Sequence, residues 1–220
     1  MKKLFEAIRK GDADTVRRLI SAKPGLIACT APSAPKKDAG QSPLQVALKT
    51  GSFGIVDLLL DSGADVGFIE DPSCGSAWRA PVVHDAINCA VMCSRWNVND
   101  RYMGFRVCST KEEADEAFRV LGRIIDAGAD VNALDSFGNS GLFRFALQAK
   151  QILPQYVCAE HRELDDRVFT PELHEDLRRI LQALKDAGAD EGYAAPNFGY
   201  SVRSFCSEGS IAVLFEEVFG

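Results

Sequence analysis

GIVDLLLDSGAD, residues 54–65, joins a short apolar pattern to the tripeptide Gly-Ala-Asp. The tripeptide recurs at residues 128–130, after FRVLGRIIDA, and at residues 188–190, after LRRILQALKDA. In each segment apolar residues recur at spacings of three and four, which predicts a helix with one buried face. The glycine that follows predicts the end of that helix, because glycine adopts left-handed backbone at little cost. The chain therefore contains an internal repeat made of a helix and a fixed turn.

A second, shorter helix is predicted upstream of each of these segments. Its clearest case begins with SPLQVA at residues 42–47. Ser42 is a favourable N-cap residue, and the proline that follows suits the first helical position. Gly51 then begins the turn to the next helix. The repeating unit is thus two helices joined by a short turn and followed by Gly-Ala-Asp.

These residues resemble the ankyrin repeat family. Residues 42–47 are similar to that family's Thr-Pro-Leu-His-x-Ala signature, and GADVNALDSFGNS at 128–140 resembles its inter-repeat hairpin. The resemblance implies an all-α fold, an ankyrin-repeat α-solenoid of stacked helix-turn-helix units in a single domain, residues 1–220. We expect five units, of which the first and last are terminal caps. Their approximate ranges are 4–27, 42–69, 80–134, 137–191 and 198–220.

The third and fourth units are much longer than the roughly 33 residues of an ordinary ankyrin unit. Thr110 and Thr170 carry N-cap signals that place the start of the second helix early in both units. We therefore expect two long second helices, each preceded by an insert, at about 94–109 and 152–169. Both inserts are expected to emerge side by side at the edge opposite the hairpins.

The two inserts differ in charge. The first is rich in arginine and the second in acidic residues, so adjacent inserts are expected to pair with each other. The expected ion pairs join Arg95, Arg101 and Arg106 to Glu163, Asp165 and Asp166. The alternative is a docking surface, because long insertions in compact repeats often carry function.

Composition limits the class of protein. Hydrophobic residues make up 46% of the chain and charged residues 25%, which is typical of a soluble globular protein. The net charge of −6 argues against a nucleic-acid binder, which needs a basic face. The seven cysteines show no paired framework, and no signal peptide or membrane-spanning run is apparent. We therefore expect reduced thiols and a cytoplasmic protein.

Catalytic and metal-binding interpretations are weaker than structural ones. His84-Asp85 has the composition of a base and its orienting acid, but His84 occupies the histidine position of the ankyrin signature, where it supports the hairpin. Cys89, Cys93 and Cys108 lack the Cys-x-x-Cys spacing of common zinc sites, so Cys89 and Cys93 are expected to be core residues. We expect no enzyme activity, no cofactor and no metal.

The resemblance implies that the chain binds another protein through a concave face made of hairpin tips and inner helices. A basic or mixed partner is favoured by the acidic charge, and the chain itself is expected to be a monomer. Trp78 and Arg79 are typical interface anchors, although Trp78 packed on the neighbouring hairpin is the alternative. The candidate contact residues are Phe68, Trp78, Arg79, Asn132, Leu134, Asp135, Phe137 and Asn139. Two other classes stay open: an inhibitor or immunity-type protein that masks a basic enzyme, and a ligand-binding or enzymatic accessory protein that uses the insert edge.

Overall fold

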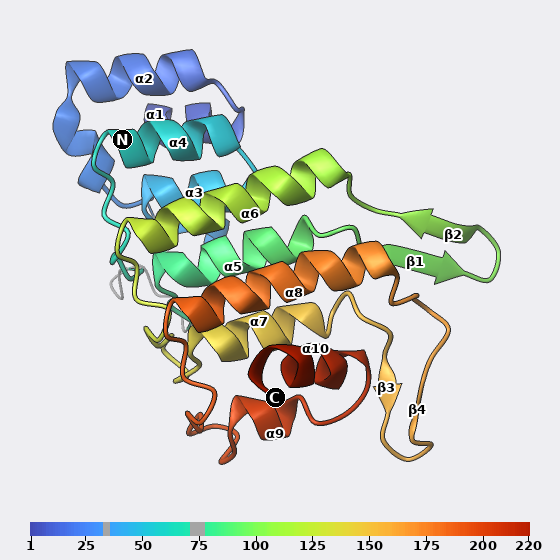
Figure 1. Cartoon of the computed structure of the whole chain (residues 1–220). Coiled ribbons are helices and arrows are strands. Elements are labelled where there is room, and N and C mark those ends of the chain that lie inside the picture. Colours follow the sequence, from blue (N-terminus) through green and yellow to red (C-terminus); the bar gives the residue numbers. More distant parts are fainter. Residues whose placement is uncertain (33–35, 71–77) are drawn as a thin grey trace.

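The computed structural model describes residues 1–32, 36–70 and 78–220. Cys74 and the centre of the enlarged loop 68–80 lie outside the described residues. The described chain is mainly helical, and its α-helices follow one another in pairs (Figure 1). The pairs are α1 (Lys2–Arg9) and α2 (Ala13–Ala22), α3 (Pro43–Lys49) and α4 (Phe53–Asp61), α5 (Val82–Met92) and α6 (Lys111–Asp126), α7 (Gly141–Ala149) and α8 (Pro171–Asp186), and α9 (Val202–Phe205) and α10 (Ser210–Phe219).

Two layers of helices run through the middle of the molecule. α3, α5 and α7 pack side by side in one layer, and α4, α6 and α8 pack in the layer in front of them (Figure 1). Two short 3-10 helices, η1 (Pro24–Ala28) and η2 (Lys36–Asp38), connect the first pair to the second. The loops between successive pairs gather at one edge of the layers.

Local sequence signals set the helix ends as expected. Gly63, Gly128 and Gly188 have φ angles of +85°, +95° and +84°, so the glycine of each Gly-Ala-Asp is left-handed. Thr110 caps α6 with a complete capping box, and the Thr170 hydroxyl accepts from the Leu173 amide at the start of α8. Both helices have 16 residues, against 9 in α4, which confirms the prediction of long second helices in these two units.

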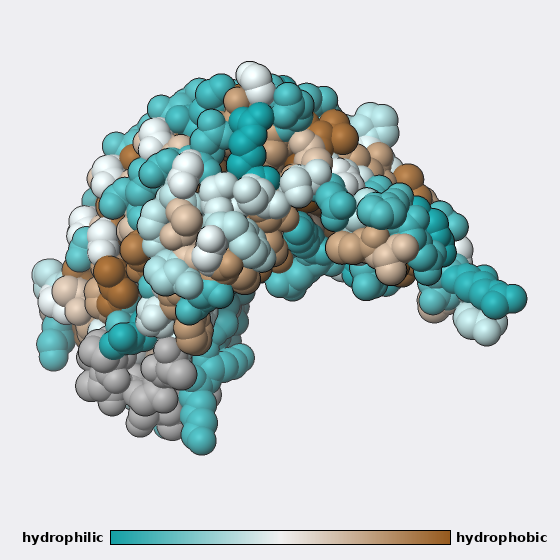
Figure 2. Space-filling view, turned by 90° about the horizontal axis from the view of Figure 1, so that it is seen from below, coloured by the Kyte–Doolittle hydropathy of each residue, from teal (hydrophilic) through white to brown (hydrophobic). Residues whose placement is uncertain are grey.

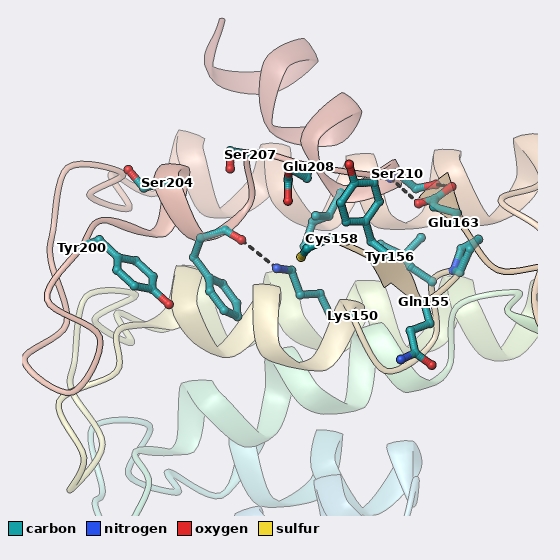
Figure 3. A pocket seen from close by; sticks show the side chains of 14 residues that line it. Lys150, Gln155, Tyr156, Cys158, Glu163, Tyr200, Ser204, Ser207, Glu208 and Ser210 are labelled. Carbon is teal, nitrogen blue, oxygen red and sulfur yellow. Dashed lines mark hydrogen bonds between the residues drawn. The ribbon is translucent and has the colours of Figure 1, made fainter. Parts of the chain in front are cut away.

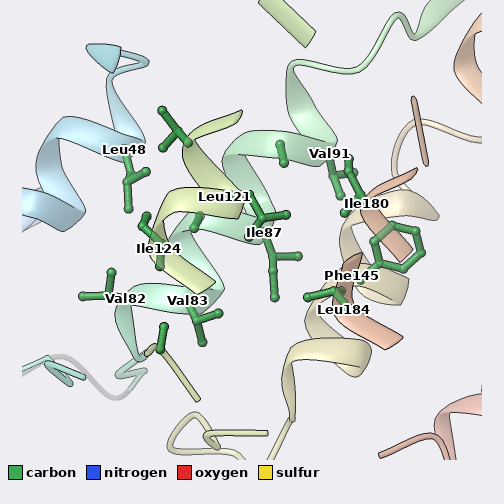
Figure 4. Packing of buried hydrophobic residues seen from close by; sticks show 14 of the residues in the cluster. Leu48, Val82, Val83, Ile87, Val91, Leu121, Ile124, Phe145, Ile180 and Leu184 are labelled. Atoms are coloured by element: carbon green, nitrogen blue, oxygen red, sulfur yellow. The ribbon is translucent and has the colours of Figure 1, made fainter. Parts of the chain in front are cut away.

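The apolar core lies between the two layers and continues from the first helix pair to the last. α5 is at its centre and is buried on most sides, because it packs against α3, α6, α7 and α8. Ile87, Leu121 and Leu184 are fully buried where these helices meet (Figure 4). Truncating one such side chain to alanine costs about 2–5 kcal/mol, so this packing dominates the stability of the middle of the molecule.

Both inserts contain strands, which the all-α prediction did not include. The first forms the antiparallel hairpin β1 (Asn97–Asp100) and β2 (Gly104–Val107), and the second forms β3 (Tyr156–Val157) and β4 (Arg162–Glu163). The two hairpins lie at the same edge, opposite the inter-pair loops, as expected (Figure 1). The inserts contact each other through backbone and amide groups: Asn97 and the Val168 backbone exchange two hydrogen bonds, of 2.7 and 2.8 Å.

The expected ion pairs between the two inserts are wrong. Arg95 instead binds Asp176 on α8, with Nε 2.8 Å from Oδ2, because Asp176 is buried and needs a counter-charge. Arg101 and Arg106 form no ion pair within the described residues. On the acidic side, Glu163 accepts hydrogen bonds from Ser210, and Asp166 pairs with its neighbour Arg167. The Asp165 carbonyl accepts from Asn99.

Candidate functional site

Large apolar side chains are exposed at three successive inter-pair loops. Ile69, Leu134, Phe137 and Tyr200 are 51%, 43%, 47% and 42% exposed. We call this set the loop face. Ile69 precedes α5, Leu134 and Phe137 precede α7, and Tyr200 precedes α9. Ile69 and Leu134 occupy the same position, six residues after the glycine of their Gly-Ala-Asp, whereas Phe137 and Tyr200 stand at other positions in their loops. The loop face therefore offers at least one exposed apolar contact point at each of three successive loops.

Two of the loops of the loop face are joined by a shallow cavity. Its volume is about 340 Å³, and its lining includes Ile69, Arg79, Leu134 and Ser136. The Ser136 amide donates to the Arg79 carbonyl at 2.9 Å, and the Arg79 amide donates to the Ser136 hydroxyl at 3.0 Å. These two hydrogen bonds join the neighbouring loops, so the exposed apolar side chains of both loops keep fixed positions relative to each other.

Asp135 is the centre of the hydrogen-bond network beneath the loop face. Its buried carboxylate accepts from the Trp78 indole at 3.1 Å and from the Arg144 guanidinium at 2.8 Å. The Asn139 amide nitrogen lies 3.0 Å from the same oxygen. Burial alone would raise the pKa of Asp135, but the hydrogen bonds from Asn139 and Trp78 lower it below the ordinary value. The network fixes the loop before α7 against the loop before α5.

The residues predicted to contact a partner fall into two groups. Leu134 and Phe137 are exposed, and Arg79 is half-buried at the cavity between the loops. The others make contacts within the protein. Trp78, Asp135 and Asn139 form the network just described, Asn132 donates to Gly188 O and accepts from Asp190 N, and Phe68 packs against the core. For Trp78 the alternative interpretation, packing on the neighbouring hairpin, agrees with these contacts.

His84 and Gln45 make the same kind of contact one helix pair apart. The Gln45 side-chain amide donates to Ala80 O at 3.1 Å, and His84 Nε2 lies 3.0 Å from Ala133 O. Each side chain thus reaches from a first helix to the loop that follows, which confirms the supporting role expected for His84. Burial, with the nearby Arg144, lowers the pKa of His84 to about 4, so the imidazole is neutral at pH 7.

Asp85 has a different environment from His84, so the two do not form a base and its orienting acid. The Asp85 carboxylate accepts from Gln45 at 2.8 Å, whereas His84 is directed to the next loop. Burial and the neighbouring Glu70 carboxylate raise the pKa of Asp85 to about 7. The sequence marks Asp85 only as the companion of His84, and no local pattern predicts its burial.

The side of the molecule that is formed by the first helix of each pair, including α3, α5 and α7, is hollow. Figure 2, which keeps the left and right of Figure 1, shows an arch with the loop side at one limb and the insert side at the other. A cavity of about 300 Å³ on this side is lined by α3 and α5 together with Trp78, and its wall includes Asp85, Cys89 and Cys93. Both thiols are half-buried, so the prediction that they are core residues is wrong. They occupy the helix face that borders the hollow.

A larger cavity, of about 450 Å³, lies between the end of α7, the second insert and the last helix pair (Figure 3). Lys150 donates to Phe205 O at 2.7 Å, and its ammonium lies 3.8 Å from the centre of the Phe205 ring. On the opposite wall Glu163 accepts from the Ser210 amide at 2.6 Å. Apolar side chains alternate with these polar groups, so the cavity suits a small amphipathic molecule. The alternative of a ligand-binding or accessory protein uses the insert edge, and this cavity includes residues of the second insert but none of the first.

Neither a metal cluster nor a membrane span is apparent in the described parts of the chain. No group of three or more His, Cys, Asp or Glu side chains there is placed to hold a metal ion. No helix of these parts is both long and apolar enough to cross a bilayer. The cysteines described in the structure are free thiols, of which Cys206 is buried.

Comparison with known proteins supports one repeat directly. No curated protein matches the chain. The family model of the ankyrin repeat matches residues 39–71, which contain α3, α4 and the SPLQVA segment. Residues 39–71 are therefore similar to an ankyrin repeat, a module that generally mediates protein–protein interaction.

Proposed function

We propose that the chain is an ankyrin-repeat solenoid of five units in one domain, and that it binds a partner protein through the loop face and the inner helices beside it. The single observation that carries this proposal is the row of exposed apolar side chains at successive loops. Solenoids bind by such rows, because each unit contributes one or two contacts to an extended surface. The unit ranges are those expected from the sequence, and the matched residues 39–71 cover the second of them.

The residues that we propose as partner contacts are those whose apolar side chains are exposed on the loop face, together with Arg79. Leu134, Phe137 and Ile69 are free to lose water on binding, and Arg79 lies between them. Interface energy usually concentrates in a few apolar, aromatic and arginine side chains of this kind. Trp78 acts indirectly in this proposal, by holding the network under Asp135. The partner is expected to be basic or mixed in charge, since the chain carries a net charge of −6.

The test begins with affinity purification from the native source and mass spectrometry, followed by calorimetry with the purified partner. The double variant Leu134→Ser/Phe137→Ser should weaken binding at least tenfold, because loss of one good interface anchor costs about 2 kcal/mol or more. Val213 is a matched control, since it is 48% exposed on α10 and lies outside the loop face. If Val213→Ser weakens binding as much as the double variant, or if neither does, the loop face is not the binding surface.

The 450 Å³ cavity supports a second candidate function, binding of a small amphipathic molecule by an accessory protein. Thermal-shift measurements against a panel of amphipathic carboxylates and amines would detect it. Ser207 is exposed at the cavity wall, so Ser207→Trp fills the cavity without disturbing the core. A ligand whose stabilising effect survives Ser207→Trp binds elsewhere, and a panel without any stabilising compound removes this candidate.

A further inference from the structure

Four exposed large apolar side chains lie within the six residues 102–107 of the β1–β2 hairpin. Tyr102 is 90% exposed and Met103 83%, and Phe105 and Val107 on β2 are about half exposed. The hairpin projects beyond the helix ends, with β1 on the side of α8 and β2 on the side away from it (Figure 1). β2 is thus an edge strand with open space beside it. Natural proteins usually protect such an edge with charges, prolines or a covering segment.

Two hydrogen bonds identify the backbone groups at the free edge of β2. The Cys108 amide donates to Trp96 O at 2.8 Å, one step beyond the Asn97–Val107 pair. The Asn99 amide donates away from β2, to Asp166 O at 2.8 Å. Because bonded and non-bonded pairs alternate in an antiparallel ladder, the amides and carbonyls of Phe105 and Val107 point away from β1.

We propose that two copies of the chain associate through these free edges, with their β2 strands antiparallel and Phe105 on the two-fold axis. Each Phe105 amide then donates to the Phe105 carbonyl of the other copy, so the pairing satisfies the same groups twice. Phe105 and Val107 lie on one face of the strand, because side chains two residues apart share a face. The four-stranded sheet that results brings the half-exposed apolar side chains of both copies together.

Charge also favours a second copy of the chain as the partner at the free edge of β2. In this register Arg106 of one copy lies opposite Gly104 of the other. Gly104 has no side chain, and its neighbour within its own hairpin is Asp100. Arg106 can therefore reach over Gly104 to the Asp100 carboxylate of the other copy. Asp100 Oδ1 accepts from the Tyr102 and Met103 amides, which leaves Oδ2 for this contact, and Arg106 has no ion-pair partner within the described residues.

The association is expected to be weak. Each β2 has only four residues, so the interface falls below the roughly 1,200 Å² of standard stable complexes. The sequence alone favoured a monomer, and a monomer remains the main species when the protein is dilute. The proposal is independent of the function proposed for the loop face, which lies at the opposite edge of the molecule.

Sedimentation equilibrium tests the proposal directly. The average mass of the full chain should rise from 23.9 kDa towards twice that value as the concentration increases from about 10 µM to about 1 mM, the range of weak interfaces. Amide exchange at Phe105 should slow over the same range, because its outward N–H becomes bonded. A constant monomer mass throughout, or a rise in mass without protection at Phe105, overturns the proposal.

Phe105→Pro is the sharpest variant, since it deletes an N–H that β1 does not use and proline is tolerated on edge strands. It should remain monomeric, with unchanged circular dichroism. Arg106→Glu should weaken association at least threefold through repulsion from Asp100, whereas Arg106→Lys should retain most of it. Phe137→Ser is the matched control, because it removes an exposed aromatic residue from the loop face. It should associate normally, and dimerisation of Phe105→Pro or loss of dimerisation in Phe137→Ser refutes the assignment to β2.

Discussion

Replacing Arg95 with alanine should destabilise the protein far more than its position in an insert suggests. The Arg95 guanidinium donates to both oxygens of Asp176, at 2.8 and 2.9 Å, and the Arg95 backbone amide donates to Asp176 at 2.9 Å. The Asp176 side chain is only 1% exposed. Removal of the guanidinium leaves this buried carboxylate with Arg179, 3.1 Å away, as its remaining charged partner in the described structure.

The expected loss is about 2–4 kcal/mol, because breaking a buried ion pair costs about 3–5 kcal/mol and Arg179 compensates in part. For a chain of this size the corresponding decrease in Tm is about 4–16 °C. Arg119 provides the comparison, since it pairs with Asp57 at 2.8 Å but is 40% exposed. Arg119→Ala should cost less than about 1 kcal/mol.

Urea unfolding followed by circular dichroism measures both variants. The double variant Arg95→Ala/Asp176→Ala should be more stable than the sum of the two single losses predicts, because the buried charge is removed with its partner. If Arg95→Ala costs no more than Arg119→Ala, Asp176 is not buried in solution and the assignment of Arg95 to α8 is wrong.

Three further changes test particular contacts. Trp78→Ala should lower the free energy of unfolding by about 2–3 kcal/mol in calorimetry, because it removes the part-buried hydrogen bond to Asp135 and the Arg144 guanidinium, 4.9 Å from the Trp78 ring centre, loses its aromatic contact. A neutral result would show that these contacts do not stabilise the fold. Asp85 has a pKa raised to about 7 when folded, so its contribution to stability is present at acid pH and lost as the pH rises through 7. Asp85→Asn should abolish that part of the dependence in urea titrations between pH 5 and 8, and equal slopes in the two proteins would disprove it. Gly141→Ala should cost about 3 kcal/mol, the upper end of the usual range for overpacking, since its Cβ would lie 2.4 Å from Val131 O. Gly122→Ala in an open position of α6 should be neutral or stabilising by up to about 1 kcal/mol, and equal effects of the two changes would show that the close approach is absent.

Local sequence signals predicted the parts of the fold that depend on local chemistry. The sequence predicted the left-handed glycines, the N-caps at Thr110 and Thr170 and the side-by-side inserts, because each follows from a few adjacent residues or from the order of the repeats. The strands within the inserts were missed. Phe105-Arg106-Val107 does alternate apolar and polar residues, but the strands have only two to four residues each, which is too short for a clear strand signal. Part of their pairing also depends on contact with the other insert.

Long-range contacts explain most of the remaining differences between the candidate site expected from the sequence and the site in the structure. Arg95 and Asp176 are 81 positions apart, and no local pattern marks Asp176 as a buried acid on an otherwise charged helix. Trp78 has the composition of an interface anchor, but its partner Asp135 belongs to the next loop. The sequence predicted two residues of the loop face, Leu134 and Phe137. Ile69 and Tyr200 are identified by the exposure of their side chains in the structure.

The inserts also determine how the chain should respond to a pulling force. Arg95 fastens the third helix pair to α8, and Glu163 holds the start of α10 through Ser210, so three consecutive pairs share links beyond their apolar packing. The first two pairs lack inserts, and their links to the next pair include the exposed contacts of Asp57 and Asp61 with α6. When the molecule is stretched by its ends, these two pairs should detach first, and the last three should then unfold together as one mechanical unit.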